Sequence, residues 1–172
     1  EIPIKAIREY IENAIDIVVQ TSRLSDGRRK ITSICEVTGF EKDNIKVIND
    51  SYNASYDSMK AALEVMGKTE ARRKIAVLGN MLELGEYTKE LHEKVGETVA
   101  KNNIDILITV GEESKNIVKE SIKLGMKKEN IYHFETTKEA VTLLKDILKA
   151  EDAVLIKASN GMHFSNIVKE II

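Results

Sequence analysis

From residue 46 onward, short apolar runs alternate with longer segments whose apolar residues recur with helical spacing. The runs are β-branched and nearly all apolar, as is typical of strands covered on both faces, and they span 46–49, 75–78, 104–110, 131–134 and 153–156. The helical segments span 57–66, 88–101, 112–124, 137–149 and 164–171. This alternation predicts right-handed crossovers and an α/β fold, Rossmann-like, with a mostly parallel sheet and helices on both faces.

Short signals mark where three of the predicted helices begin or end. Gly67 and Gly125 follow the first and third helical segments, where glycine takes the left-handed cap conformation at least cost. Thr136, with Glu139 three positions later, has the pattern of a capping box at the start of the fourth helix. These signals agree with the boundaries that the apolar spacing predicts.

The first 45 residues have a different pattern. Residues 4–15 have helical spacing, and 16–24 and 30–37 resemble two strands joined by a turn at 25–27, where Asp-Gly favours a tight hairpin. A helix and a hairpin followed by a regular strand–helix series indicate a change of organisation, with a boundary near 41–45. We therefore predict two units, residues 1–45 and residues 46–172.

Composition narrows the function classes. The chain has 172 residues, of which 42% are hydrophobic and 31% charged, so it can bury a core and stay in solution. Its net charge of −2, with both signs interspersed, argues against nucleic-acid binding. One cysteine excludes an internal disulfide, and no apolar run or signal peptide predicts membrane insertion. The sequence starts without Met inside a helical pattern, so we expect an excised or engineered piece of a cytoplasmic protein.

Polar residues follow the predicted strands, at the edge where parallel sheets bind ligands. The loop 50–55 contains Asp50, Tyr52 and Asn53, whose carboxylate, phenol and amide suit hydrogen bonds to a ribose or an amide substrate. An ordinary strand-to-helix turn with an N-cap at Ser55 explains the same residues equally well. The residues alone leave both interpretations open.

Two further loops carry candidate binding groups. In the loop 79–85, Glu83 can bind an ammonium group or orient a lysine, although a solvated loop carboxylate is slightly favoured. Lys157 ends the last apolar run beside Ser159 and Asn160, which suits a carboxylate or phosphate partner. The alternative is a lysine whose ammonium reaches solvent from the end of a strand.

Metal and phosphate sites are not predicted. No three potential metal ligands have suitable spacing, and His92, alone on a predicted helix, is typical of a packing or surface residue. Residues 67–69 read Gly-Lys-Thr, but they follow a helix, and Ala62 occupies the position where a phosphate-binding loop needs glycine. We predict a helix end there.

Three motifs, at 48–63, 76–85 and 154–162, together resemble the C-terminal domain of the UDP-N-acetylmuramoyl-tripeptide–D-alanyl-D-alanine ligases, in the Mur ligase family. The resemblance covers residues 47–172. Tyr56 stands where the family pattern has proline, Asn80 where it has aspartate, and Asn160 where it has arginine. The last difference removes a bidentate partner for a carboxylate.

The resemblance implies a three-domain enzyme of peptidoglycan synthesis in which ATP phosphorylates the tripeptide carboxylate and the D-Ala-D-Ala amine attacks the acyl-phosphate. ATP and Mg²⁺ would bind to the intact enzyme, and the UDP-muramoyl-tripeptide to a domain absent from this chain. We expect this chain alone to hold no cofactor, to contain no catalytic residue and to be inactive. By the same resemblance, the nucleotide side would include Asp50, Tyr52 and Asn53, and the dipeptide side would include Glu83, Lys157, Ser159 and Asn160.

Residues 1–45 resemble a different family, because several short motifs within 3–41 are similar to the distal part of a type II/IV secretion ATPase of the pilus-assembly class. We therefore expect a chimera, in which the hairpin 16–37 supplies an edge to the ligase-type sheet. An alternative function is a non-catalytic interaction module, or a fragment of a secretion-system ATPase. An independent small-molecule enzyme has little support, because no nucleophile and base are suitably spaced.

Overall fold

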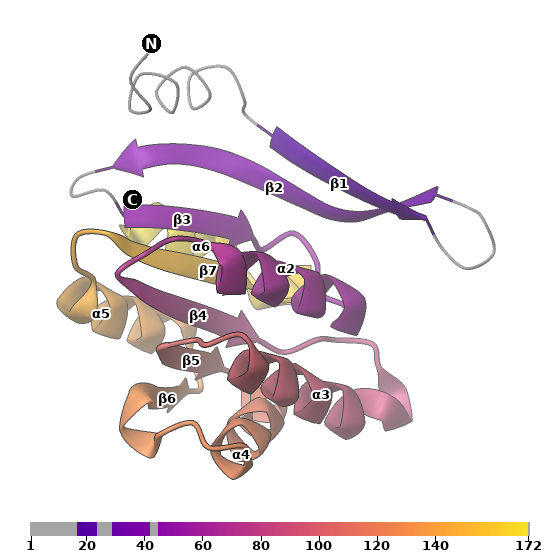
Figure 1. Ribbon diagram of the computed structural model, residues 1–172. Coiled ribbons are helices and arrows are strands. Elements are labelled where there is room, and N and C mark those ends of the chain that lie inside the picture. Colours follow the sequence, from indigo (N-terminus) through magenta and orange to yellow (C-terminus); the bar gives the residue numbers. More distant parts are fainter. Residues whose placement is uncertain (1–16, 24–28, 42–44, 172) are drawn as a thin grey trace.

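The computed structural model describes the backbone of residues 17–23, 29–41 and 45–171, and side chains from 45 to 171. These residues form one seven-stranded sheet in the order β1-β2-β3-β7-β4-β5-β6 (Figure 1). The strands are β1 (Ile17–Arg23), β2 (Arg29–Glu41), β3 (Ile45–Asp50), β4 (Arg73–Gly79), β5 (Ile106–Val110), β6 (Ile131–Phe134) and β7 (Asp152–Lys157). Strands β3 to β7 are mutually parallel, so the predicted Rossmann-like α/β fold is confirmed.

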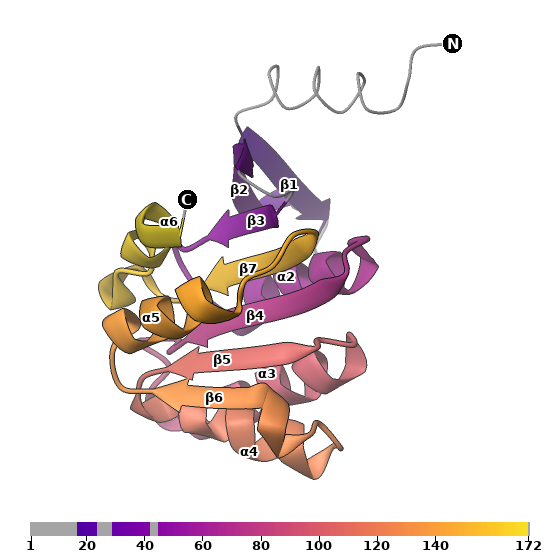
Figure 2. The same ribbon diagram turned by 90° about the vertical axis from the view of Figure 1, so that its left-hand side faces the viewer.

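The helices form two layers, one on each face of the sheet, because β7 lies between β3 and β4. The helices are α2 (Tyr56–Lys68), α3 (Thr88–Lys101), α4 (Lys115–Lys123), α5 (Thr137–Ile147) and α6 (Ser165–Ile171), with short 3₁₀ turns η1 (Gly85–Tyr87), η2 (Glu112–Ser114), η3 (Lys128–Asn130) and η4 (Asn160–Met162). The chain runs from β3 towards β6 through α2, α3 and α4, and returns to β7 through α5. Right-handed crossovers therefore place α5 on the face of the sheet opposite to α2, α3 and α4. The last helix, α6, follows β7 and packs on the same face as α5 (Figure 2).

Each face of the sheet has its own apolar core. Along β4, Ala76 and Leu78 pack with α2 and α3, whereas Ile75 and Val77 pack with α5 and α6. All four side chains are fully buried, because successive residues of a strand point to opposite faces. This burial on both faces explains why the strands are continuous apolar runs.

The helix ends agree with the sequence signals at all but one position. Thr136 and Glu139 form the predicted capping box, and Ser55 caps α2 through its own capping box with Ser58. Gly125 follows α4 with φ +102°, as predicted. The left-handed cap predicted at Gly67 is wrong, since this glycine lies inside α2. A Cβ there would lie 2.6 Å from Oδ1 of Asn102, so close packing of α2 on the segment after α3 accounts for the glycine.

The predicted hairpin extends the sheet. β1 pairs antiparallel with β2, and β2 pairs antiparallel with β3, which confirms that this segment supplies an edge. β2 continues to Glu41, beyond the predicted end at residue 37. The predicted helix at 4–15 and turn at 25–27 lie outside the described residues. Among those that are described, no helix is both long and apolar enough to cross a membrane.

Candidate functional site

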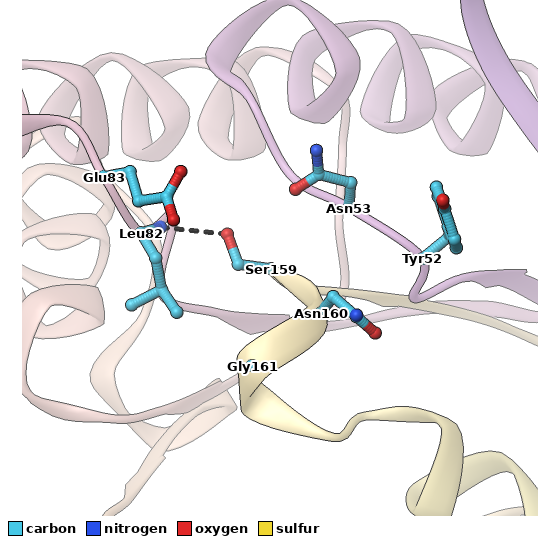
Figure 3. Close-up of a pocket in the computed structure, with 7 residues that line it drawn as sticks. All are labelled: Tyr52, Asn53, Leu82, Glu83, Ser159, Asn160 and Gly161. Atoms are coloured by element: carbon cyan, nitrogen blue, oxygen red, sulfur yellow. Dashed lines mark hydrogen bonds between the residues drawn. The ribbon is translucent and has the colours of Figure 1, made fainter.

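An open pocket of about 280 Å³ lies at the carboxyl ends of β3, β7 and β4 (Figure 3). It forms because β7 lies between β3 and β4, which brings three loops together although they are far apart in sequence. Such a position outside the strand ends is where ligands bind in open α/β sheets. The described residues that line the pocket are Tyr52, Asn53, Leu82, Glu83, Ser159, Asn160 and Gly161.

One wall of the pocket, formed by the loop after β4, is attached to the end of β7 by Ser159. The backbone N–H of Ser159 donates to the carbonyl of Asn80 at 3.1 Å, and its Oγ accepts from the backbone N–H of Leu82 at 2.9 Å (Figure 3). Ser159 is 5% exposed, so both hydrogen bonds are largely shielded from water. The loop is therefore fixed at two successive points.

The opposite wall, formed by the loop after β3, is attached to β7 by Lys157. Its Nζ donates to Oδ2 of Asp50 at 2.7 Å and to the carbonyl of Asn53 at 2.8 Å. The Lys157 side chain is 1% exposed, which excludes the alternative of an ammonium reaching solvent. Burial raises the pKa of Asp50, while the neighbouring Lys157 charge opposes that rise.

The structure thus sorts the seven predicted site residues into two groups. Five of them line the pocket: Tyr52, Asn53, Glu83, Ser159 and Asn160. Asp50 and Lys157 lie outside this lining and bind each other. Direct ligand contact by these two residues stays a prediction.

Sequence reasoning missed Leu82 and Gly161 as pocket residues. Leu82 is an apolar side chain that stays exposed, and its position between the polar residues of the loop 79–85 was the available signal. Asn80, in the same loop, turns elsewhere, because its Oδ1 accepts from the backbone N–H of Ser114 at 3.0 Å. Asn80, a departure from the family pattern, is therefore not among the described lining residues.

His92 is a packing residue, as predicted. Its ring is fully buried, and Nε2 accepts from the backbone N–H of Met81 at 3.0 Å. Nδ1 must then carry the proton that it donates to the carbonyl of Thr88 at 2.6 Å. Burial lowers the pKa of His92, against the opposing effects of the Thr88 carbonyl and Glu113, so the ring is neutral near pH 7. His92 thereby fixes the start of the loop that carries Glu83.

The residue types at the pocket suit hydrogen bonding to neutral groups and do not suit the binding of phosphate groups. Amide, hydroxyl and phenol groups can bind a ribose or a peptide by hydrogen bonds. The lining residues include no lysine or arginine that could meet phosphates, and within the described residues no three His, Cys, Asp or Glu side chains are grouped to hold a metal ion. The described lining residues therefore offer no cation to the phosphates of ATP.

Comparison with known proteins identifies the family. The sequence profile described as "Mur ligase, glutamate ligase domain" matches residues 35–160, well over half of the chain. The chain belongs to the Mur ligase family. It is 35% identical to the UDP-N-acetylmuramoyl-tripeptide–D-alanyl-D-alanine ligase of Bacillus subtilis, over 80% of this chain and 31% of the relative. It is 33% identical to the ligase of the same name from Rickettsia prowazekii, over 89% and 32%.

A solved Mur ligase supports the same assignment. The crystal structure of the MurF ligase from Thermotoga maritima, in complex with ADP, superimposes with a TM-score of 0.63 at 26% identity. The match covers 76% of this chain and 29% of that protein. This Mur ligase chain therefore spans about a third of the length of the relatives that it matches.

The Mur ligase match also bears on the first 45 residues. The family profile begins at residue 35, inside β2. Residues 46–172 make up 127 of the 172 positions, about 74%, so a match over 89% of the chain has to include part of residues 1–45. These comparisons lend no support to the predicted secretion-ATPase origin or to a chimera. The predicted helix at 4–15 lies outside the described residues, so the alternative of an interaction module stays a prediction.

Proposed function

We propose that this chain is the C-terminal domain of a cytoplasmic, ATP-dependent ligase that joins D-alanyl-D-alanine to UDP-N-acetylmuramoyl-tripeptide in peptidoglycan synthesis. The observation that carries the proposal is the meeting of all three family-like motifs at one pocket. Curated relatives at 33–35% identity bear the name of this ligase. Residues 46–172 contain every described lining residue, so we propose them as the functional unit, with the hairpin as its edge.

The pocket residues divide by chemistry between two ligands. We assign Tyr52 and Asn53 to the ribose and base side of the nucleotide, and Glu83, Ser159 and Asn160 to the dipeptide. Among the described lining residues, Glu83 alone carries a formal charge, and a carboxylate suits the ammonium group of the dipeptide. Asn160 offers an amide to the dipeptide carboxylate, which binds more weakly than an arginine would. On this assignment, the dipeptide amine and the nucleotide would lie on opposite walls of the same pocket.

The part of the reaction left to this domain is binding and orientation. Phosphate and Mg²⁺ chemistry would belong to the parts of the ligase that this chain does not span. The described lining residues offer no lysine or arginine to phosphates, and the described residues contain no group of three metal ligands. ATP, Mg²⁺ and the UDP-linked tripeptide are then ligands of the whole enzyme. We expect the chain alone to be inactive.

A hybrid enzyme tests the proposal. Residues 46–172 would replace the corresponding third of the Bacillus subtilis ligase, and ADP release would be measured with each substrate omitted in turn. We expect turnover that requires ATP, the UDP-linked tripeptide and D-Ala-D-Ala together. A folded hybrid without turnover would contradict the proposal, as would turnover by the chain alone.

A pair of variants in that hybrid tests the role of Glu83. Glu83→Gln should raise KM for D-Ala-D-Ala about fivefold, because an exposed charge pair contributes roughly 1 kcal/mol. Glu86→Gln changes the same charge in the next turn, outside the pocket lining, and should leave KM unchanged. Equal effects of the two variants would show that Glu83 acts only through overall charge.

A further inference from the structure

The end of β7 contacts both walls of the pocket. We call residues 157–159 the β7 anchor. On the β3 side, Lys157 binds the side chain of Asp50 and the carbonyl of Asn53. On the β4 side, Ser159 binds the backbone of Asn80 and Leu82. Two residues that are two positions apart therefore hold loops that are otherwise separate in sequence.

The Lys157 contacts are positioned to orient the first wall. Asn53 lines the pocket, and its carbonyl is one of the acceptors of the buried ammonium. Asp50 is the last residue of β3, so the same ammonium joins the rigid strand to the loop that follows it. A fully buried ammonium group must be hydrogen-bonded to acceptors, so the Lys157 ammonium restricts where the carbonyl of Asn53 can lie.

The Ser159 contacts act on the second wall independently. Leu82 donates its backbone N–H to the Ser159 hydroxyl, and Glu83 is the next residue. Glu83 has φ +63°, a left-handed conformation that is strained for a residue other than glycine. A strained residue needs its surroundings to hold it, and the adjacent hydrogen bond is one such restraint.

We infer that the β7 anchor sets the separation of the two pocket walls, with Lys157 positioning Tyr52 and Asn53, and Ser159 positioning Leu82 and Glu83. In this role Lys157 is a positioning residue, because it acts through the carbonyl of Asn53. The inference rests on the proposed function only for the identity of that ligand. The positions of the walls can be tested without any ligand.

The direct test measures backbone order by nuclear magnetic resonance in the whole ligand-free chain. Lys157→Met should lower the order parameters of residues 51–54 from about 0.85 to below about 0.6, and leave 80–85 rigid. Ser159→Ala should loosen 80–85 and leave 51–54 rigid. Arg73→Met is the matched control: it breaks an ion pair of β7 at the opposite edge of the sheet and should loosen neither wall.

A second variant separates positioning from stability. Asp50→Asn combined with Lys157→Met removes both buried charges, so the melting temperature should recover most of what Lys157→Met loses. The 51–54 loop should stay loose in the double variant, because the Asn53 carbonyl still lacks its donor. If this loop becomes rigid again, or if Lys157→Met lowers the melting temperature without loosening it, the inference is overturned.

Kinetics of the hybrid ligase supply the functional readout. Because Lys157 positions the wall assigned to the nucleotide, Lys157→Met should lower kcat/KM for ATP at least about tenfold, since displaced positioning groups can cost a hundredfold. Unchanged kcat/KM in a folded variant would overturn the inference. A wild-type hybrid without turnover would contradict the proposed function alone, because the order measurements need no substrate.

Discussion

An ion pair joins neighbouring strands at each end of the parallel strands, and the two pairs have different consequences. We call the end where the parallel strands begin the amino edge of the sheet, and the end where they finish the carboxyl edge. At the amino edge, Arg73 of β4 donates Nε to Oδ1 of Asp152 at 2.9 Å and Nη2 to Oδ2 at 2.5 Å. The same carboxylate accepts from the backbone N–H of Lys149, and the guanidinium donates to the carbonyl of Ile147. All these partners lie at the end of α5 or the start of β7, so the pair closes this edge.

At the carboxyl edge, the pair of Lys157 and Asp50 lies beside a pocket. The cation of this pair is a lysine, whereas that of the amino-edge pair is an arginine. One acceptor of the Lys157 ammonium is the carbonyl of Asn53, a pocket residue. The same strand, β7, thus contributes a charge to both pairs. The amino-edge pair therefore joins only structural elements, whereas the carboxyl-edge pair also holds the carbonyl of a pocket residue, and we expect it to position that loop.

The largest effect should come from breaking the amino-edge pair. Asp152→Ala leaves the Arg73 guanidinium and the Lys149 N–H without their carboxylate, and should cost about 3–5 kcal/mol of unfolding free energy. Urea denaturation measures this loss. Asp146→Ala, an exposed control on α5, should stay within about 0.5 kcal/mol of the wild type. A loss below 1 kcal/mol for Asp152→Ala would show that the pair does not stabilise this edge.

The carboxyl-edge pair should be less costly to break. Lys157→Met should lower the unfolding free energy by about 2–3 kcal/mol, because Asp50, left without its cation, can take up a proton. Burial already raises the pKa of Asp50 in the folded state. The folded variant therefore binds protons more readily than the unfolded chain, and its stability deficit should shrink as pH falls. A deficit independent of pH would contradict this explanation.

A smaller and opposite effect is expected at two strained glutamates, one at each edge. Glu83 has φ +63° and Glu151, just before β7, has φ +67°. Replacing either with glycine should raise stability by about 1 kcal/mol, because glycine adopts this conformation without strain. Only Glu83→Gly should also raise KM for D-Ala-D-Ala in the hybrid. Equal KM values for the two variants would remove the functional distinction between the edges.

The smallest effect should be a loss of stability in mild acid that depends on His92. Its pKa is lowered by burial, so the unfolded chain binds this proton more readily than the folded chain does. The contribution is complete above the ordinary histidine pKa of about 6.5 and is lost as pH falls through the lowered value. Urea denaturation at several pH values should show a smaller loss for His92→Gln than for the wild type. Identical profiles would exclude His92 as the cause.

The sequence predicted the elements of the fold better than their arrangement. Strands and helices after residue 46 end within a few residues of their predicted limits, because apolar spacing reports burial directly. The insertion of β7 between β3 and β4 has no local signal, since it depends on how crossovers pack. Gly67 was misassigned for a related reason: its neighbour, Asn102, lies in a distant segment.

The same distinction applies to the candidate site. Five predicted residues line the pocket, because polar residues after strands mark the ligand edge of such sheets. The pairing of Lys157 with Asp50 was not predicted, as the two are 107 positions apart and meet only through the strand order. Leu82 was overlooked because exposed leucines are common and carry little information singly.

Whether the carboxyl-edge pocket binds the dipeptide is tested most directly by titrating the ¹⁵N-labelled chain with D-Ala-D-Ala and recording the shifts of its amide resonances. We expect binding no tighter than about 1 mM, with shifts concentrated at residues 82–83 and 159–161 and none around Arg73 and Asp152. Shifts confined to the amino edge, or no shifts at tens of millimolar, would contradict the claim that the carboxyl-edge pocket receives the dipeptide.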